Sequence, residues 1–118
     1  MDITVEEITS RLQDLPVEIY KREIRCNILR EKADLAQLDF DREFAKEFQL
    51  AMASDLTAAE ARQQATAKTA DLKIALIKAN SRLGAAQVKL HKVSNEFVSI
   101  RKQASIKNEE IFNERARR

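Results

Sequence analysis

The sequence is poor in glycine, proline and aromatic residues. It has one Gly and one Pro in 118 residues, where average composition would give ~8 and ~6. Strands are joined by turns that Gly and Pro usually build, which argues against a sandwich, a barrel or a doubly wound α/β fold. Ala occurs 17 times and charged residues make up 34% of the chain, as is typical of long helices. We therefore expect an all-α fold.

Cysteine and histidine are equally scarce, with Cys26 and His91 the single examples. One of each cannot form a disulfide framework or a zinc site, and an unpaired Cys fits a reducing cytosol. The sequence also lacks a Gly-rich phosphate loop, a nucleophile elbow and paired carboxylates around a concave site. We expect no catalytic residue, no metal, no cofactor and no small-molecule ligand, so the chain is not predicted to be an enzyme.

Long apolar runs are absent as well. No uninterrupted apolar run exceeds four residues, whereas a bilayer span needs ~20. The first residues do not combine a basic region with an apolar core, so a signal peptide is not expected. These features predict a cytoplasmic protein without a membrane partner.

Two capping boxes mark helix starts. In Thr4-Val5-Glu6-Glu7 and Thr57-Ala58-Ala59-Glu60, the Thr hydroxyl can accept from the third residue's amide while the Glu side chain reaches back. Pro16 is expected to end the first helix and to open the next, where its missing N–H costs nothing. We predict a short helix over 4–14 and long helices over 16–53 and 58–113.

The third predicted helix carries the most specific pattern in the sequence. Ten apolar residues follow alternating spacings of four and three, which indicates a left-handed coiled-coil contact. We call this set the seam: Leu72, Leu76, Ala79, Leu83, Ala86, Leu90, Val93, Phe97, Ile100 and Ala104.

The short segment at 54–57 predicts that the second helix folds back against the seam. If the chain reverses near Leu56, residue numbers at facing positions sum to about 112. Reflection of the first five seam residues gives Cys26, Leu29, Ala33, Ala36 and Phe40 in reverse order, and reflection of the last four gives Ile8, Leu12, Leu15 and Ile19. Only Leu90, opposite Arg22, breaks the match. The predicted fold is a single elongated antiparallel helical hairpin, or coiled coil, over residues 1–118.

The second predicted helix has more apolar surface than one partner can bury. At about 100° per residue, a second apolar group lies roughly opposite the side that meets the seam. We call this group the second face: Val17, Ile24, Ile28, Leu35 and Leu38. A helix with two apolar faces needs two partners, so we predict a homo-oligomer that pairs through the second face.

Charge is divided unevenly along the chain. Residues 1–60 carry 14 acids and 8 bases, and residues 61–118 carry 5 acids and 13 bases. Either the two halves attract each other within a hairpin, or the basic half meets an anion such as nucleic acid. The candidate anion contacts form what we call the basic end: Arg101, Lys102, Lys107, Arg115, Arg117 and Arg118.

Several segments resemble the small helical-hairpin proteins encoded by tailed phages and prophages. They are Leu15-Pro16-Val17-Glu18-Ile19-Tyr20, Leu56-Thr57-Ala58-Ala59-Glu60-Ala61-Arg62, Leu76 to Ala79, and Glu96-Phe97-Val98-Ser99-Ile100-Arg101. The resemblance covers about residues 15–106. It implies an accessory or adaptor protein in phage DNA metabolism or host interference, acting on an unidentified protein partner in the bacterial cytoplasm. The alternative is a weak, sequence-independent nucleic-acid binder that uses the basic end.

Overall fold

The chain folds into three α-helices in a computed structural model, which describes residues 3–117. They are α1 (Val5–Ala53), α2 (Ala58–Lys68) and α3 (Ala70–Ala116), and the described residues contain no strand. The all-α prediction is therefore confirmed. No helix in this part of the chain is both long and apolar enough to cross a bilayer.

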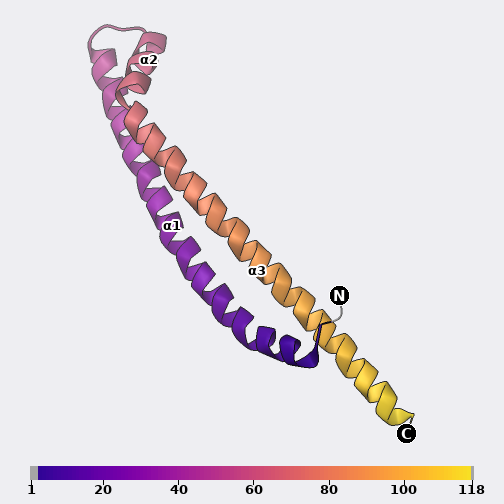
Figure 1. The fold of residues 1–118 in the computed structure, drawn as a ribbon. Helices are drawn as coiled ribbons and strands as arrows, with labels where there is room; N and C mark the ends of the chain where they lie inside the picture. Colours follow the sequence, from indigo (N-terminus) through magenta and orange to yellow (C-terminus); the bar gives the residue numbers. More distant parts are fainter. Residues whose placement is uncertain (1–2, 118) are drawn as a thin grey trace. The chain divides into compact units, whose positions relative to one another are not determined.

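Two compact units divide the chain. Unit 1 combines the N-terminal part of α1, up to Cys26, with α3 from Ala86 onward, and unit 2 comprises Asn27–Ala85. Within each unit, α1 and α3 run side by side in opposite directions (Figure 1). This is the antiparallel helical hairpin that the sequence predicts.

Helix α1 starts at the first predicted capping box and runs through Pro16 without interruption. The Thr4 amide donates to Glu7 Oε2 at 3.2 Å, and the Glu7 amide donates to Thr4 Oγ1 at 3.1 Å. The prediction of two separate helices, 4–14 and 16–53, is therefore wrong, because one helix covers both ranges. Pro16 costs ~3 kcal/mol inside a helix, but Leu15 beside it is fully buried. Burying one such side chain contributes ~1.5–3 kcal/mol, so the apolar stripe on both sides of Pro16 can outweigh the proline.

The predicted helix 58–113 is instead two helices that meet at Thr69. Helix α2 begins at the second capping box, where the Glu60 amide donates to Thr57 Oγ1 at 3.2 Å. At Thr69 the backbone leaves the helical region (φ −105°, ψ 12°), and its amide and its hydroxyl both donate to the Ala65 carbonyl, at 3.0 and 2.7 Å. A threonine side chain that bonds to the backbone in this way competes with helix continuation. Thr9 and Thr66 make the same bond to the carbonyl four residues earlier, at 2.9 and 2.7 Å, inside uninterrupted helices, so this bond alone does not cause the break. The capping and apolar patterns do not reveal it.

The core of unit 1 is built from the start of α1 and the last four seam residues of α3. One apolar cluster contains the reflected residues from α1 and the last four seam residues of α3, together with Ile3: Ile8, Leu12, Leu15, Ile19, Val93, Phe97, Ile100 and Ala104. In unit 1 the structure thus brings together the residues that were predicted to face each other, whose numbers add up to 112. Leu90 and Arg22, the mismatched pair, are both half-buried.

The core of unit 2 uses the other seam residues and the small side chains near the turn. Leu29, Ala33 and Leu76 are buried, as are Ala51, Ala61 and Ala65. The remaining predicted positions of this unit are half-buried: Ala36, Phe40, Leu72, Ala79 and Leu83. Cys26 is buried and Ala86 half-buried in unit 1. No predicted seam residue is exposed.

Leu76 and Ile77 form a matched pair that tests this packing. Leu76 is 3% exposed and its neighbour Ile77 is 57% exposed. We expect Leu76→Ala to lower the free energy of unfolding by ~2–5 kcal/mol, because it leaves a cavity in the core. Ile77→Ala should change it by ~0.5 kcal/mol or less. Urea unfolding at one fixed protein concentration measures both, and equal losses would contradict the burial pattern.

Candidate protein-interaction face

The second face lies exposed on α1. Val17, Ile24, Ile28, Leu35 and Leu38 are each 42–60% exposed, although all five are large apolar side chains. The positions of α1 that meet α3 are buried or half-buried on the opposite side of the same helix. Since the second face belongs to one continuous helix, its alignment follows from the helical period alone.

Tyr20 extends the second face and was not among the predicted residues. Its side chain is 64% exposed and lies three residues after Val17 and four before Ile24. The i, i+3, i+7 spacing places it on the same side of the helix as these two residues. This spacing could have identified Tyr20 from the sequence as part of the second face. Its aromatic ring adds a large contact area to an interface.

Exposed apolar residues on α3 do not form a comparable stripe. Ile74, Ile77, Val88, Val98 and Phe112 are exposed. At heptad spacing, however, polar or small residues separate them: Ser81, Gly84, His91 and Asn95. Single exposed apolar residues are normal on a protein surface, whereas an aligned row indicates a contact site.

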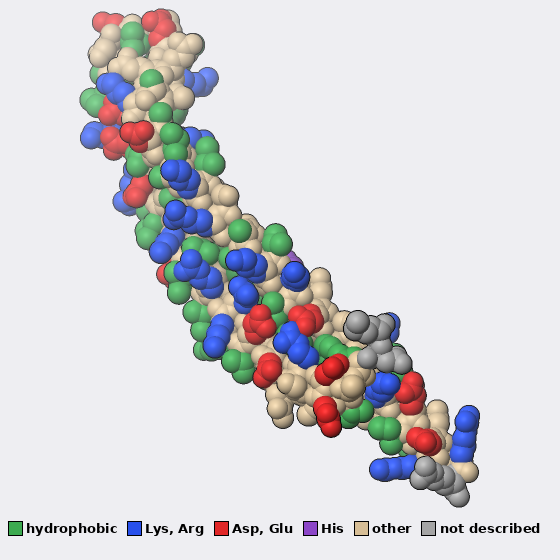
Figure 2. Space-filling model, in the orientation of Figure 1, with side chains coloured by type: hydrophobic (Ala, Val, Ile, Leu, Met, Phe, Trp, Pro, Cys, Tyr) green, Lys and Arg blue, Asp and Glu red, His purple; other side chains and the backbone are tan. Residues whose placement is uncertain are grey.

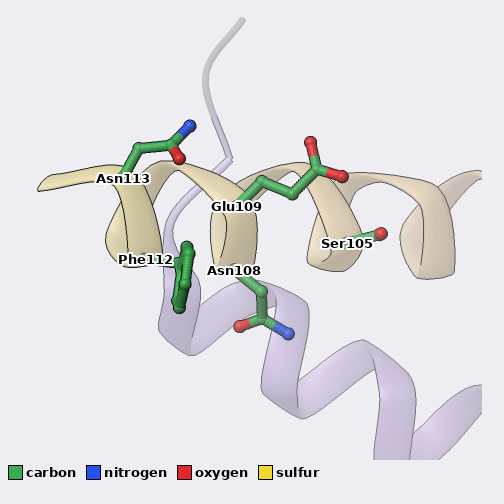
Figure 3. Close-up of a pocket in the computed structure, with 5 residues that line it drawn as sticks. All are labelled: Ser105, Asn108, Glu109, Phe112 and Asn113. Carbon is green, nitrogen blue, oxygen red and sulfur yellow. The ribbon is translucent and has the colours of Figure 1, made fainter. Parts of the chain in front are cut away.

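One hollow in the described surface lies along the C-terminal part of α3. It is lined by Ser105, Asn108, Glu109, Phe112 and Asn113, all from α3 (Figure 3). Within residues 3–117 no group of three or more His, Cys, Asp or Glu side chains could hold a metal ion. His91 is exposed and Cys26 is buried.

A second hollow lies beside the break at Thr69 and has mainly apolar walls. Phe40 lines it together with Thr66, Ala70 and Ile74. Lys73 also lines it and holds its Nζ 5.0 Å from the centre of the Phe40 ring. The ring is therefore already engaged in a cation–π contact.

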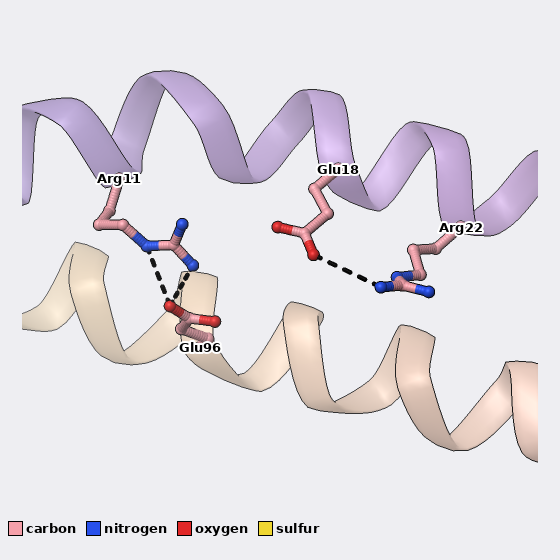
Figure 4. A network of polar contacts seen from close by, with 4 residues as sticks. All are labelled: Arg11, Glu18, Arg22 and Glu96. Carbon is pink, nitrogen blue, oxygen red and sulfur yellow. Dashed lines mark hydrogen bonds and ion pairs between the residues drawn. The ribbon is translucent and has the colours of Figure 1, made fainter.

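One ion pair beside the core of unit 1 joins α1 to α3, and a second lies within α1. Arg11 on α1 donates from Nε to Glu96 Oε1 on α3 at 3.0 Å, and its NH2 group pairs with the same oxygen (Figure 4). The hydrogen bond to Glu96 raises the pKa of Arg11 further above its ordinary value. On α1, Arg22 lies 3.7 Å from Glu18. The sequence patterns did not reveal the Arg11–Glu96 pair, because it flanks the seam outside the facing positions.

Acidic residues interrupt the basic end. Lys107 Nζ lies 3.7 Å from Glu110 Oε2, and Arg101 stacks over the Phe97 ring at 5.7 Å. Toward the C-terminus of α3, acidic and basic side chains alternate on the face drawn in Figure 2. Lys102, Arg115 and Arg117 are exposed, whereas Arg118 lies outside the described residues. This end is therefore not a continuous cationic surface.

A more uniform cationic surface lies in the middle of α3 and was missed by the sequence analysis. Four cations recur at spacings of 4, 7 and 3, which places them along one side of the helix; we call Lys78, Arg82, Lys89 and Lys92 the basic stripe. No acid occurs between Leu72 and Asn95. The absence of acidic residues from this segment could have revealed the stripe in the sequence. A comparison of the net charges of the two halves of the chain does not show it.

Comparison with known proteins gives no assignment for these surfaces: no family model, no curated protein and no solved structure matches the chain.

Cys26 offers a test of which side of α1 is covered. Its side chain is 3% exposed on the side that meets α3, and a thiol must be accessible to react. We expect native Cys26 to react with a thiol reagent at least ~100-fold more slowly than the same thiol in urea. The control is Ser81→Cys in a Cys26→Ala background, which places a thiol on exposed α3 surface. Equally fast native reactions would contradict the assigned sides.

Proposed function

We propose that the chain is a non-enzymatic protein–protein interaction module that self-associates through the second face. The observation that carries this proposal is the aligned exposure of five large apolar side chains on α1, opposite the side that α3 covers. Such a row loses unfavourable contact with water when it meets another apolar surface. A second copy of the chain supplies a surface of the same kind and length.

The biological role of the module rests on the resemblance to helical-hairpin proteins of tailed phages. It supports an accessory or adaptor protein in phage DNA metabolism or host interference, located in the cytoplasm of the bacterial host. In that role, self-association would present two hairpins to a further protein partner. The second face belongs to α1 alone, so its pairing leaves the exposed side of α3 accessible to that partner.

Self-association predicts a mass above that of one chain, and Ile28→Glu should reduce it. A carboxylate in the paired second face would be desolvated without a partner. We expect light scattering to give a multiple of the chain mass at high micromolar concentration for the natural protein, and a monomer for this variant. Ile77→Glu is the matched control, since Ile77 is the same residue type and is also exposed but lies on α3. A monomeric natural protein would contradict the proposal.

The basic stripe favours a second candidate function, sequence-independent binding of nucleic acid. Within residues 3–117 none of Lys78, Arg82, Lys89 and Lys92 forms an ion pair. Unpaired cations along one side of a helix can contact successive phosphates. In this candidate function, the phosphate contacts lie in the middle of α3 and not at the basic end, where the sequence analysis placed them.

Salt dependence distinguishes the stripe from the basic end. If the stripe binds DNA, the double variant Lys89→Gln/Lys92→Gln should weaken binding and make the slope of log K against log salt about 2 units shallower, because two phosphate contacts are lost. Arg115→Gln/Arg117→Gln is the control and should leave the slope nearly unchanged. Titrations with single- and double-stranded DNA measure both, and no binding at low salt would remove the candidate.

A further inference from the structure

The second face belongs to a longer repeat that contains two charged residues. Positions 17, 21, 24, 28, 31, 35 and 38 of α1 follow spacings of 4, 3, 4, 3, 4 and 3, the heptad pattern of a coiled-coil contact. Five of these positions hold the second face. Lys21 and Glu31 occupy the other two, and both are exposed.

We propose that two copies of the chain pair antiparallel through this repeat, with Lys21 of each copy opposite Glu31 of the partner copy. The inference rests on the proposed self-association and adds its direction and register. Residue numbers at facing positions then sum to 52. Val17 meets the partner's Leu35, and Ile24 meets the partner's Ile28.

The two charges decide between the antiparallel and the parallel arrangement. An in-register parallel pair would place Lys21 against the partner's Lys21, and Glu31 against the partner's Glu31. Like charges inside a contact are unfavourable, whereas a polar or charged core position that finds its complement fixes register. Among the described residues neither Lys21 nor Glu31 makes an ion pair within its own chain. Both are therefore available to a partner.

Neighbouring antiparallel registers fail on the same two residues. A shift to a sum of 59 places Lys21 against the partner's Leu38 and Ile28 against the partner's Glu31. A shift to a sum of 45 places Lys21 against the partner's Ile24 and Glu31 against the partner's Asp14. Only the sum of 52 matches apolar with apolar and cation with anion across its six layers. Leu38 then lies at the edge of the contact, opposite the partner's Asp14.

The fold leaves this side of α1 available. In both units the residues of α1 that meet α3 are buried or half-buried on the opposite side of the helix. Two hairpins can therefore pair through α1, and each α3 stays on the outside of the contact.

Disulfide formation between separately made variants tests the direction. Val17→Cys and Leu35→Cys are each prepared in a Cys26→Ala background, mixed under reducing conditions so that subunits exchange, and then oxidised. We expect the mixture to form the 17–35 heterodimeric disulfide and neither variant alone to crosslink efficiently. In the proposed register, identical positions lie 18 residues apart along the contact, or ~27 Å, which no disulfide can bridge. Arg30→Cys, exposed on another side of α1, is the control and should not crosslink to Val17→Cys.

A charge exchange tests the register without cysteines. Lys21→Glu and Glu31→Lys should each weaken association by about tenfold or more, and the double variant should recover most of the loss. In a parallel pair, the double variant would have like-charge layers just as the natural protein does. Combining the two substitutions would then not restore association strength.

The outcomes separate this inference from the proposed function. A multiple of the chain mass together with homodimeric disulfides in each variant alone would show parallel pairing and overturn the register. A multiple of the chain mass without any disulfide at these positions would show that another surface or register pairs, and would also overturn it. A monomeric mass of the natural protein would overturn the proposed function itself.

Discussion

The packing of the α3 seam against the apolar stripe of α1 is the interaction on which the rest of the structure depends. A helix of this length is not held by local propensity alone, because most helical stability in proteins comes from burying an amphipathic face. In unit 1 that burial carries α1 across Pro16, with Leu15 fully enclosed. Because α3 packs against one side of α1, the opposite side of α1, with its own apolar row, stays uncovered.

Much of this arrangement could be predicted from the sequence, since few alternatives fit its patterns. The capping box at Thr4 forms in both directions, and at Thr57 the Glu60 amide donates to the threonine hydroxyl as expected, while the Glu60 carboxylate accepts from that hydroxyl rather than from the Thr57 amide. The reflected positions in unit 1 meet in one core. The continuity through Pro16 could not be predicted, because it depends on tertiary burial that outweighs a local penalty. The break at Thr69 could not be predicted either, because Thr9 and Thr66 make the same bond to the carbonyl four residues earlier without interrupting their helices. Many threonines in helices form no such break, so their sequence neighbourhood does not identify it.

Of the candidate sites, too, one could be predicted from the sequence and others could not. Periodicity located the second face, because exposure of an apolar row follows directly from the helical period once α3 covers the other side. It did not locate the basic stripe, since the net charge of half a chain hides a local absence of acids. The Arg11–Glu96 pair was also out of reach, because long side chains beside a seam can bridge positions several residues away from exact opposition. The feature that supports an interaction module is the row of large apolar side chains exposed on α1.

Methyl NOE spectroscopy tests the antiparallel seam most directly, because it needs no substitution. The antiparallel packing of α1 on α3 predicts NOEs from the Leu15 methyl groups to those of Val93 and Ile100. In a sample that mixes labelled and unlabelled chains, isotope filtering should show that these NOEs arise within one chain. Their absence, or their appearance only between chains, would contradict the hairpin and every surface assigned from it.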